Sequence, residues 1–258
     1  GCLPDMLVPV HLTGRSCPMQ QIRGLADQYG IRVVEDASHA LGGTYQGETI
    51  GICRHSDAAV FSFHPVKSIT TGEGGAVTTN SADLAESMRE IRHHGITRDR
   101  CRLIKSGQPG YYHEQQRMGF NFRLSDIHAA LGCSQLTRLG SFVQHRRDLA
   151  AHYHHRLADI ADRITRPPPD AGSAWHLYAV NCRSMRHRDN LYARFLAEGV
   201  RTAVHYLPVY SHPWYRQYHP SLPLVGAEAY ANTALTLPLH TLLTESDIDR
   251  FTCLMSTV

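Results

Sequence analysis

The stretch VFSFHPVKSITTGEGGAVTTN, from Val60 to Asn80, places a lysine where the surrounding pattern predicts little water. Lys67 follows an apolar run that is typical of a buried strand, and it precedes a glycine-rich turn. The whole chain has only two lysines, Lys67 and Lys105, among its 26 basic residues. Because the remaining basic residues are all arginine, we ask which property of lysine is needed at position 67.

The property that separates the two side chains is the ability to lose a proton. An amine can become neutral and condense with an aldehyde, whereas a guanidinium stays protonated in proteins. A desolvated lysine on a tight turn is therefore a candidate Schiff-base nucleophile. The simpler interpretations are a lysine whose amine reaches solvent, or a lysine paired with a carboxylate.

A carboxylate is predicted close to this lysine. Asp36 ends the short apolar strand IRVVED, at the carboxyl edge of a sheet, where open α/β sheets bind ligands. Pyridoxal phosphate (PLP) needs a lysine for its aldehyde and a carboxylate that keeps its pyridine nitrogen protonated. Asp36 and Lys67, on successive strand ends, could supply both groups. The other interpretation of Asp36 is a simple helix cap.

Two further polar residues adjoin this pair. The hydroxyl of Ser62, five residues before Lys67, could reach the phosphate of a cofactor. His39, three residues after Asp36, could lie beside the ring oxygen, or it could be a polar residue under the sheet edge. Gly72 to Gly75 would allow close backbone approach and a sharp reversal.

The first half of the chain alternates predicted strands and helices, which favours an α/β domain with a mostly parallel sheet. Strands are predicted at 7–12, 31–35, 58–63 and 75–79, and a helix at 18–30 that stops at Gly30. A second helix is predicted to be capped by Asn80 or Ser81 and closed by Gly95, and a polar loop follows at 98–117.

The second half predicts a smaller α+β domain, so we expect a large domain over 1–140 and a small one over 141–258. Helices are predicted at 125–139, 142–160 and 190–198, strands at 176–181, 202–206 and 235–239, and a linker at the RPPPD stretch, 166–170. Thr244 and Asp247 resemble a capping box that opens a final helix.

Composition excludes several classes of protein. The net charge of +3 is small and the basic residues are scattered, which argues against nucleic-acid binding. No run reaches the length of a membrane span. The seven cysteines form no CxxC pair, which favours a reduced, cytoplasmic setting. The 18 histidines lack the spacing of a closed metal site, so no metal is expected.

Three long motifs identify the chain as resembling a known family. The segments EDASHALGGTYQGETIG (35–51), FSFHPVKSITTGEGGAVTTN (61–80) and GFNFRLSDIHAALGCSQL (119–136) resemble the DegT/DnrJ/EryC1/StrS sugar aminotransferases. The resemblance implies an aspartate aminotransferase-like PLP enzyme of fold type I. Within the family, HGITRD, VHYLPVY and LTLPLH are most similar to transaminases of pseudaminic acid biosynthesis.

The resemblance assigns cofactor contacts to four residues already singled out. Lys67 would bond covalently to the PLP aldehyde and later carry the proton between the amine carbon and the sugar carbon. Asp36 would pair with the pyridine nitrogen, and His39 would lie at the ring face or its O3′. Ser62 would bind the phosphate.

The resemblance also implies a homodimer with shared active sites. Asn121 would reach the phosphate of the cofactor in the neighbouring subunit. His205 and Tyr206 match a family loop near the substrate. Arg123 could be a phosphate ligand or part of an ion pair at a helix start, and both interpretations stay open.

The expected reaction moves an amino group from glutamate to C4 of a 4-keto-6-deoxy UDP-N-acetyl sugar, in a ping-pong cycle. A sugar dehydratase relative is one alternative, but those proteins place a histidine at the position of Lys67. A non-catalytic binding module on the same scaffold is the other alternative.

The opening segment of the family, including a Gly-Thr/Ser helix start that holds the cofactor phosphate, has no counterpart in these 258 residues. We therefore expect the large domain to be incomplete and the chain to be part of a longer protein, here called the full-length parent. The 258 residues alone are expected to be inactive.

Overall fold

The computed structural model describes residues 2–218 and 224–256, which form two compact units. Unit 1 comprises residues 2–10, 17–38 and 48–138. Unit 2 comprises residues 11–16, 39–47 and the described part of 139–258. Each unit is described by itself.

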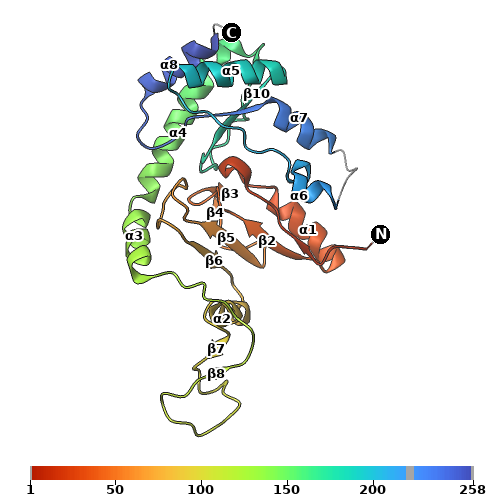
Figure 1. The fold of residues 1–258 in the computed structure, drawn as a ribbon, viewed down its shortest axis with the longest axis vertical. Coiled ribbons are helices and arrows are strands. Elements are labelled where there is room, and N and C mark those ends of the chain that lie inside the picture. Colours follow the sequence, from red (N-terminus) through yellow and green to blue (C-terminus); the bar gives the residue numbers. More distant parts are fainter. Residues whose placement is uncertain (1, 219–223, 257–258) are drawn as a thin grey trace. The chain divides into compact units, whose positions relative to one another are not determined.

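Unit 1 is built on a four-stranded sheet (Figure 1). Its strands lie in the order β1-β2-β5-β6, with bounds β1 Met6–Leu7, β2 Arg32–Asp36, β5 Ala58–Ser62 and β6 Gly75–Thr78. β1, β2 and β5 are parallel, and β6 returns antiparallel to β5. The mostly parallel sheet was predicted from the alternation of elements, and the register pairs Asp36 with Val60 and Ser62 with Gly75.

The helices of unit 1 begin and end at residues whose chemistry explains the boundary. α1 (Met19–Tyr29) ends at Gly30, which adopts a left-handed φ of 66°. Ser81 caps α2 (Ala82–Ile91) by accepting a hydrogen bond from the Leu84 N–H, and Ser125 caps α3 (Asp126–Leu136) in the same way.

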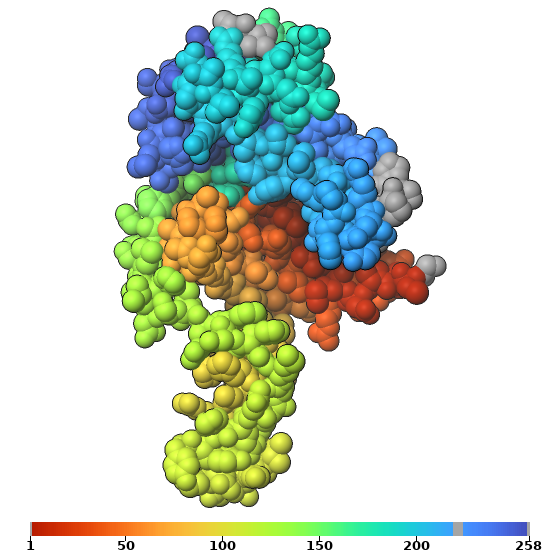
Figure 2. Space-filling view, in the orientation of Figure 1, coloured from red at the N-terminus to blue at the C-terminus, as the bar shows by residue number. Residues whose placement is uncertain are grey.

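Residues 92–123 form an arm that extends away from the sheet of unit 1. Its short strands β7 (Ile96–Thr97) and β8 (Glu114–Gln115) pair antiparallel inside the segment that was predicted as a loop. The arm is the yellow to yellow-green lobe of the space-filling view (Figure 2). Backbone hydrogen bonds between β7 and β8, together with side-chain hydrogen bonds, therefore order this stretch, although its polar sequence shows no helical or strand periodicity.

Unit 2 contains the largest apolar core. Its antiparallel sheet has the order β11-β10-β9, with β9 Ile164–Thr165, β10 Tyr178–Cys182 and β11 Ala234–Leu237. Its helices are α4 Leu139–Arg156, α5 Met185–Ala197, α6 Pro213–Arg216, α7 Val225–Thr233 and α8 Glu245–Ser256. Tyr153, Tyr178, Phe195, Leu235 and Ile248 are fully buried between these elements.

The remaining elements are short: strands β3 Thr44–Tyr45 and β4 Glu48–Thr49, and 3-10 turns at Leu12–Gly14, Ala158–Ile160 and Val209–Ser211. The strand predicted at 202–206 is present only as a single bridge between Ala203 and Thr236. The prediction was wrong because the segment turns away after one pairing. α5 starts five residues earlier than predicted, where Ser184 caps it.

The two units differ from the expected division at residue 140, because two short segments of the first half, residues 11–16 and 39–47, belong to unit 2. The Ala174 N–H donates to the Gly14 carbonyl at 3.0 Å, and the Thr44 N–H donates to the Gly172 carbonyl at 2.7 Å. Residues 11–16 and 39–47 thus group with unit 2. The RPPPD stretch lies inside unit 2 and is not an interdomain linker.

Among the described residues, no helix is both long and apolar enough to cross a membrane.

Candidate active site

Asp36 is fixed at the carboxyl end of β2 by its own backbone. Its N–H donates to the Pro9 carbonyl at 2.9 Å, and Val10 forms a parallel bridge with it. The carboxylate Oδ1 accepts the Ser38 N–H at 3.0 Å, which leaves the second oxygen for another partner. The side chain is half-buried, so a rigid carboxylate stands at the edge of the sheet.

Lys67 lies on the turn that connects β5 to β6, and backbone hydrogen bonds define that turn. The Lys67 N–H donates to the His64 carbonyl at 2.9 Å, and the Thr71 N–H donates to the Phe63 carbonyl at 3.0 Å. Ser62, the last residue of β5, accepts the His64 N–H on its hydroxyl at 3.3 Å. The turn therefore holds the amine-bearing residue in place and keeps the Ser62 hydroxyl at the strand end.

The environment of Lys67 lowers the pKa of its amine. Burial lowers the pKa of Lys67, and the Asp36 carboxylate opposes this by raising it. Desolvation is the larger effect, so the pKa lies below the ordinary lysine value. The opposing effect of Asp36 is the one expected of a carboxylate near a protonated amine. A larger neutral fraction at a given pH makes Lys67 a better nucleophile.

A second cluster of predicted residues lies in unit 2 around His39. This imidazole is buried; the Thr13 N–H donates to its Nδ1 at 3.3 Å, and the Tyr206 hydroxyl lies 3.4 Å from its Nε2. The rings of His39 and His176 pack with centroids 4.4 Å apart. His205 hydrogen-bonds the Thr236 hydroxyl through Nδ1 at 2.9 Å. The structure thus brings His39, His205 and Tyr206 into one cluster.

Sequence reasoning missed two members of this cluster. Thr13 contributes a backbone N–H, for which its side chain carries no signal. His176 stands at the start of a predicted strand, where nothing in its spacing points to His39. Thr13, His39 and His176 come together because residues 11–16 and 39–47 belong to unit 2, as residue 176 does.

Asn121 lies on the arm of unit 1 and is exposed. Its side-chain oxygen accepts a hydrogen bond from Arg123 Nε at 2.7 Å, and its backbone forms an antiparallel bridge with His93. The Arg123 side chain therefore orients the Asn121 amide. The structure places Asp36, Ser62 and Lys67 at neighbouring strand ends and presents Asn121 from a separate part of the same unit.

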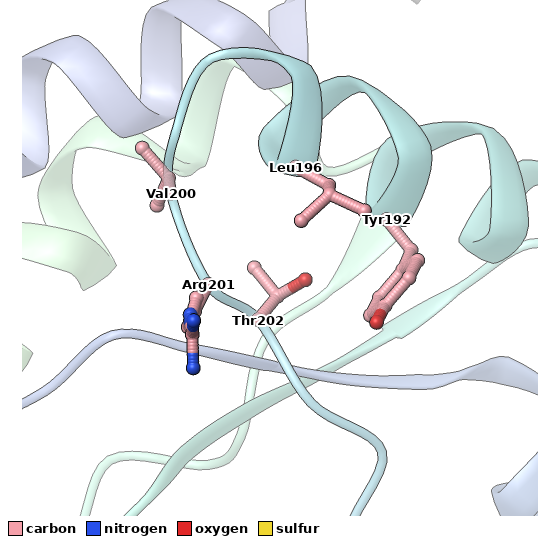
Figure 3. A pocket seen from close by; sticks show the side chains of 5 residues that line it. All are labelled: Tyr192, Leu196, Val200, Arg201 and Thr202. Atoms are coloured by element: carbon pink, nitrogen blue, oxygen red, sulfur yellow. The ribbon is translucent and has the colours of Figure 1, made fainter.

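A small pocket of unit 2 carries none of these residues. It has a volume of about 220 Å³ and is lined by Tyr192, Leu196, Val200, Arg201 and Thr202 (Figure 3). It contains no carboxylate, amine or thiol and is not a candidate active site. No group of three His, Cys, Asp or Glu residues suited to a metal ion occurs in the described part of the chain.

A lysine on the turn after one strand, and a carboxylate at the end of the parallel strand beside it, are the two groups that PLP needs from a protein. The mixed α/β fold matches the PLP-dependent transferases of fold type I. The family model of the DegT/DnrJ/EryC1/StrS aminotransferases matches residues 5–255, and the chain belongs to this family.

Solved structures of other proteins share the fold. Over 96% of its length the chain is similar to Helicobacter pylori PseC, an aminotransferase involved in the biosynthesis of pseudoaminic acid, with 30% identity and a TM-score of 0.88. DesV of S. venezuelae is similar over 96% of the chain, with 34% identity and a TM-score of 0.83. The sugar aminotransferase homologue Spr1654 of Streptococcus pneumoniae, solved in its PLP form, is similar over 98%, with 26% identity and a TM-score of 0.81. The chain spans 65% of PseC, 63% of DesV and 68% of Spr1654.

Proposed function

We propose that the full-length parent is a PLP-dependent aminotransferase that acts on nucleotide sugars. The observation that carries the proposal is the pair of Lys67 and Asp36 in unit 1: a half-buried amine with a lowered pKa, and a carboxylate that interacts with it. Family membership supports the same assignment.

The residues present suit PLP. The neutral fraction of the Lys67 amine can bond to an aldehyde, and the Asp36 carboxylate, already oriented by the Ser38 N–H, can hold a proton on a pyridine nitrogen. The hydroxyl of Ser62 can bind one phosphate oxygen. When bound, PLP supplies an electron sink for the carbon that carries the amino group.

Each residue then has a defined task. Lys67 holds the cofactor and moves a proton between the donor or sugar carbon and the cofactor, because its amine can both accept and donate. Asp36 keeps the pyridine nitrogen protonated. His39 contacts the ring face or its O3′, and His205 and Tyr206 contact the substrate. Asn121 serves the phosphate of the cofactor in a second subunit of a homodimer.

The proposed substrate is a 4-keto-6-deoxy UDP-N-acetyl sugar, which receives the amine at C4, and the proposed donor is glutamate. The similarity to PseC and the VHYLPVY and LTLPLH segments support a role in pseudaminic acid or related nucleotide-sugar biosynthesis. The cysteine usage supports a reduced cytoplasmic setting, and all seven cysteines are free thiols.

The test supplies the purified full-length parent with PLP, glutamate and a panel of 4-keto UDP-sugars, and follows 2-oxoglutarate release. We expect release that depends on one of the sugars and disappears in Lys67→Ala. The matched control, Lys105→Ala, alters the only other lysine of these 258 residues and should keep the rate. Sugar-dependent water loss without 2-oxoglutarate would instead identify a dehydratase, and no turnover of any sugar would favour a binding module.

A further inference from the structure

We propose that Glu90 is a positioning residue that holds the arm in the form that presents Asn121. Glu90 lies in the last turn of α2, directly before the arm, and only 2% of it is exposed. Its two carboxylate oxygens each meet an arginine of the arm. Arg102 Nη2 lies 2.8 Å from one, and Arg117 Nε lies 3.2 Å from the other.

A buried carboxylate is costly unless it is paired, so these two ion pairs favour the arrangement that keeps both arginines beside Glu90, although neither carboxylate oxygen makes a hydrogen bond with a described residue. Arg102 lies on the outgoing limb of the arm and Arg117 on the returning limb. Glu90 therefore ties both limbs to the end of α2. Glu86, one turn earlier, also contacts Arg102 at 3.4 Å, but its carboxylate is much more exposed.

The outer part of the arm is closed by a different acidic residue. Glu114 accepts the N–H groups of Ile104 and Lys105 at 2.7 and 2.9 Å. These backbone bonds lower the pKa of Glu114 to about 2, so it stays ionised at physiological pH. Glu114 orders the tip, and Glu90 orders the base.

The base of the arm leads directly to the Asn121 motif. The Phe120 N–H donates to the Ile91 carbonyl at 2.6 Å, and the Phe122 N–H donates to the Arg92 carbonyl at 2.9 Å. Backbone hydrogen bonds thus connect residues 119–123 to the residues that directly follow Glu90. A Cβ added at Gly119 would overlap the backbone of Gly95, so the two segments touch without room for a side chain.

Glu90 consequently positions Asn121 indirectly. It fixes Arg117, and the short backbone from Arg117 through Gly119 leads to Asn121. Loss of the Glu90 charge leaves both arginines without their buried partner and so removes one contact from each limb. This inference rests on the proposed function for one point, namely that Asn121 serves the active site of the partner subunit.

The first experiment measures the order of the arm without reference to activity. The arm contains trypsin sites at Arg92, Arg98, Arg100, Arg102, Lys105, Arg117 and Arg123. In the full-length parent, Glu90→Gln should accelerate cleavage within the arm at least about tenfold, because a buried ion-pair partner is lost. The matched control, Glu86→Gln, should stay within about twofold of wild type, because its carboxylate is more exposed. Arg117→Gln releases one limb and also removes the cleavage site at residue 117, so cleavage is compared at Arg98, Arg100 and Lys105, where this variant should reproduce the effect if Glu90→Gln fails to fold. Cleavage rates at wild-type level in Glu90→Gln, or in Arg117→Gln, would overturn the proposal.

The second experiment measures the activity of mixed dimers. If Glu90→Gln only destabilised its own subunit, pairing that subunit with another variant would not recover activity. A Glu90→Gln subunit combined with a Lys67→Ala subunit should recover activity, because the Lys67→Ala subunit supplies an intact arm to an intact lysine. Glu90→Gln combined with Asn121→Ala should recover none, since both arms are defective.

The control mixture is Asn121→Ala with Lys67→Ala. If it recovers activity and the Glu90→Gln mixture does not, Glu90 does not act through the arm and the inference fails. If the control itself recovers nothing, the shared-site part of the proposed function fails, and the trypsin rates alone decide whether Glu90 holds the arm.

Discussion

At the scale of single residues, burial lowers the pKa of both Lys67 and Arg146, but only the amine of Lys67 can become neutral, because a guanidinium stays protonated in proteins. Burial lowers the pKa of Lys67 while Asp36 raises it, and the balance lies below the ordinary lysine value. A residue that only needed to carry positive charge would gain nothing from desolvation.

Replacement of Lys67 by arginine tests this difference. Lys67→Arg keeps the charge and removes the neutral amine, so the full-length parent should fold and lose transamination. General acid–base steps typically contribute about 10²–10⁴-fold, and loss of the covalent bond to the cofactor should add to that. Steady-state turnover measures the effect; a rate within about tenfold of wild type, or roughly 1.4 kcal/mol in barrier, would leave Lys67 as an ion-pair partner.

The pH dependence of Lys67 gives a second test at this scale. In cofactor-free full-length parent, acylation of Lys67 should become half-maximal below pH 10.5, because the neutral amine reacts and its pKa is lowered. Asp36→Asn removes the carboxylate that raises the pKa, so the midpoint should fall further. Asp83→Asn, an exposed change in α2, is the matched control. Mass spectrometry of the Lys67 peptide reports the rates; a rise in the midpoint on Asp36→Asn would contradict the electrostatic account.

At the scale of elements, the parts predicted best are those with a local physical cause. Gly30 ends α1, and Ser81 begins α2, as their chemistry requires. Asp36 and Lys67 could be placed at strand ends because the strands β2 and β5 are apolar and short. The paired strands of the arm could not be predicted, because the Glu90 and Glu114 contacts that order them join residues up to 27 positions apart along the chain.

The His39 cluster shows the same limit. Predicting it requires knowing that residues 11–16 and 39–47 return to unit 2, which depends on the backbone hydrogen bonds of Gly14 and Thr44. Residue type alone suggested a polar role for His39. The roles of Asp36, His39, Ser62, Lys67, Asn121, His205 and Tyr206 stay predictions until they are measured.

One buried arginine joins the elements of unit 2. Arg146 of α4 is buried and donates through Nη1 to the carbonyls of Trp175, His176 and Leu239, at 3.3, 3.2 and 2.7 Å. Arg146→Met keeps much of the stem but leaves these carbonyls without that donor. A buried group left unsatisfied costs about 1–3 kcal/mol, so we expect the free energy of unfolding to fall by at least about 2 kcal/mol.

Chemical denaturation of the full-length parent measures the Arg146 effect. Arg186→Met, an exposed change on α5, should alter stability by less than about 0.5 kcal/mol. Equal stabilities for the two variants would show that the carbonyl contacts of Arg146 contribute little.

At the scale of the whole molecule, the sheet of unit 1 has apolar side chains at both edges. Val8 and Val10 adjoin β1 and Val77 lies on β6, and these three are 56%, 46% and 43% exposed. Unpaired apolar edges promote association. Residues 1–258 expressed alone should therefore associate and bind PLP poorly. Light scattering and PLP titration test this; a monodisperse species with the PLP affinity of the full-length parent would refute it.

The central claim is that Lys67 bonds covalently to PLP, and within these 258 residues the only other lysine is Lys105. The full-length parent is incubated with PLP, reduced with borohydride and digested, and the peptide that carries the cofactor is identified by mass spectrometry. The account predicts the cofactor on the peptide with Lys67 and its absence in Lys67→Arg. Cofactor on Lys105 or on any other lysine of the full-length parent, or on none, would contradict it.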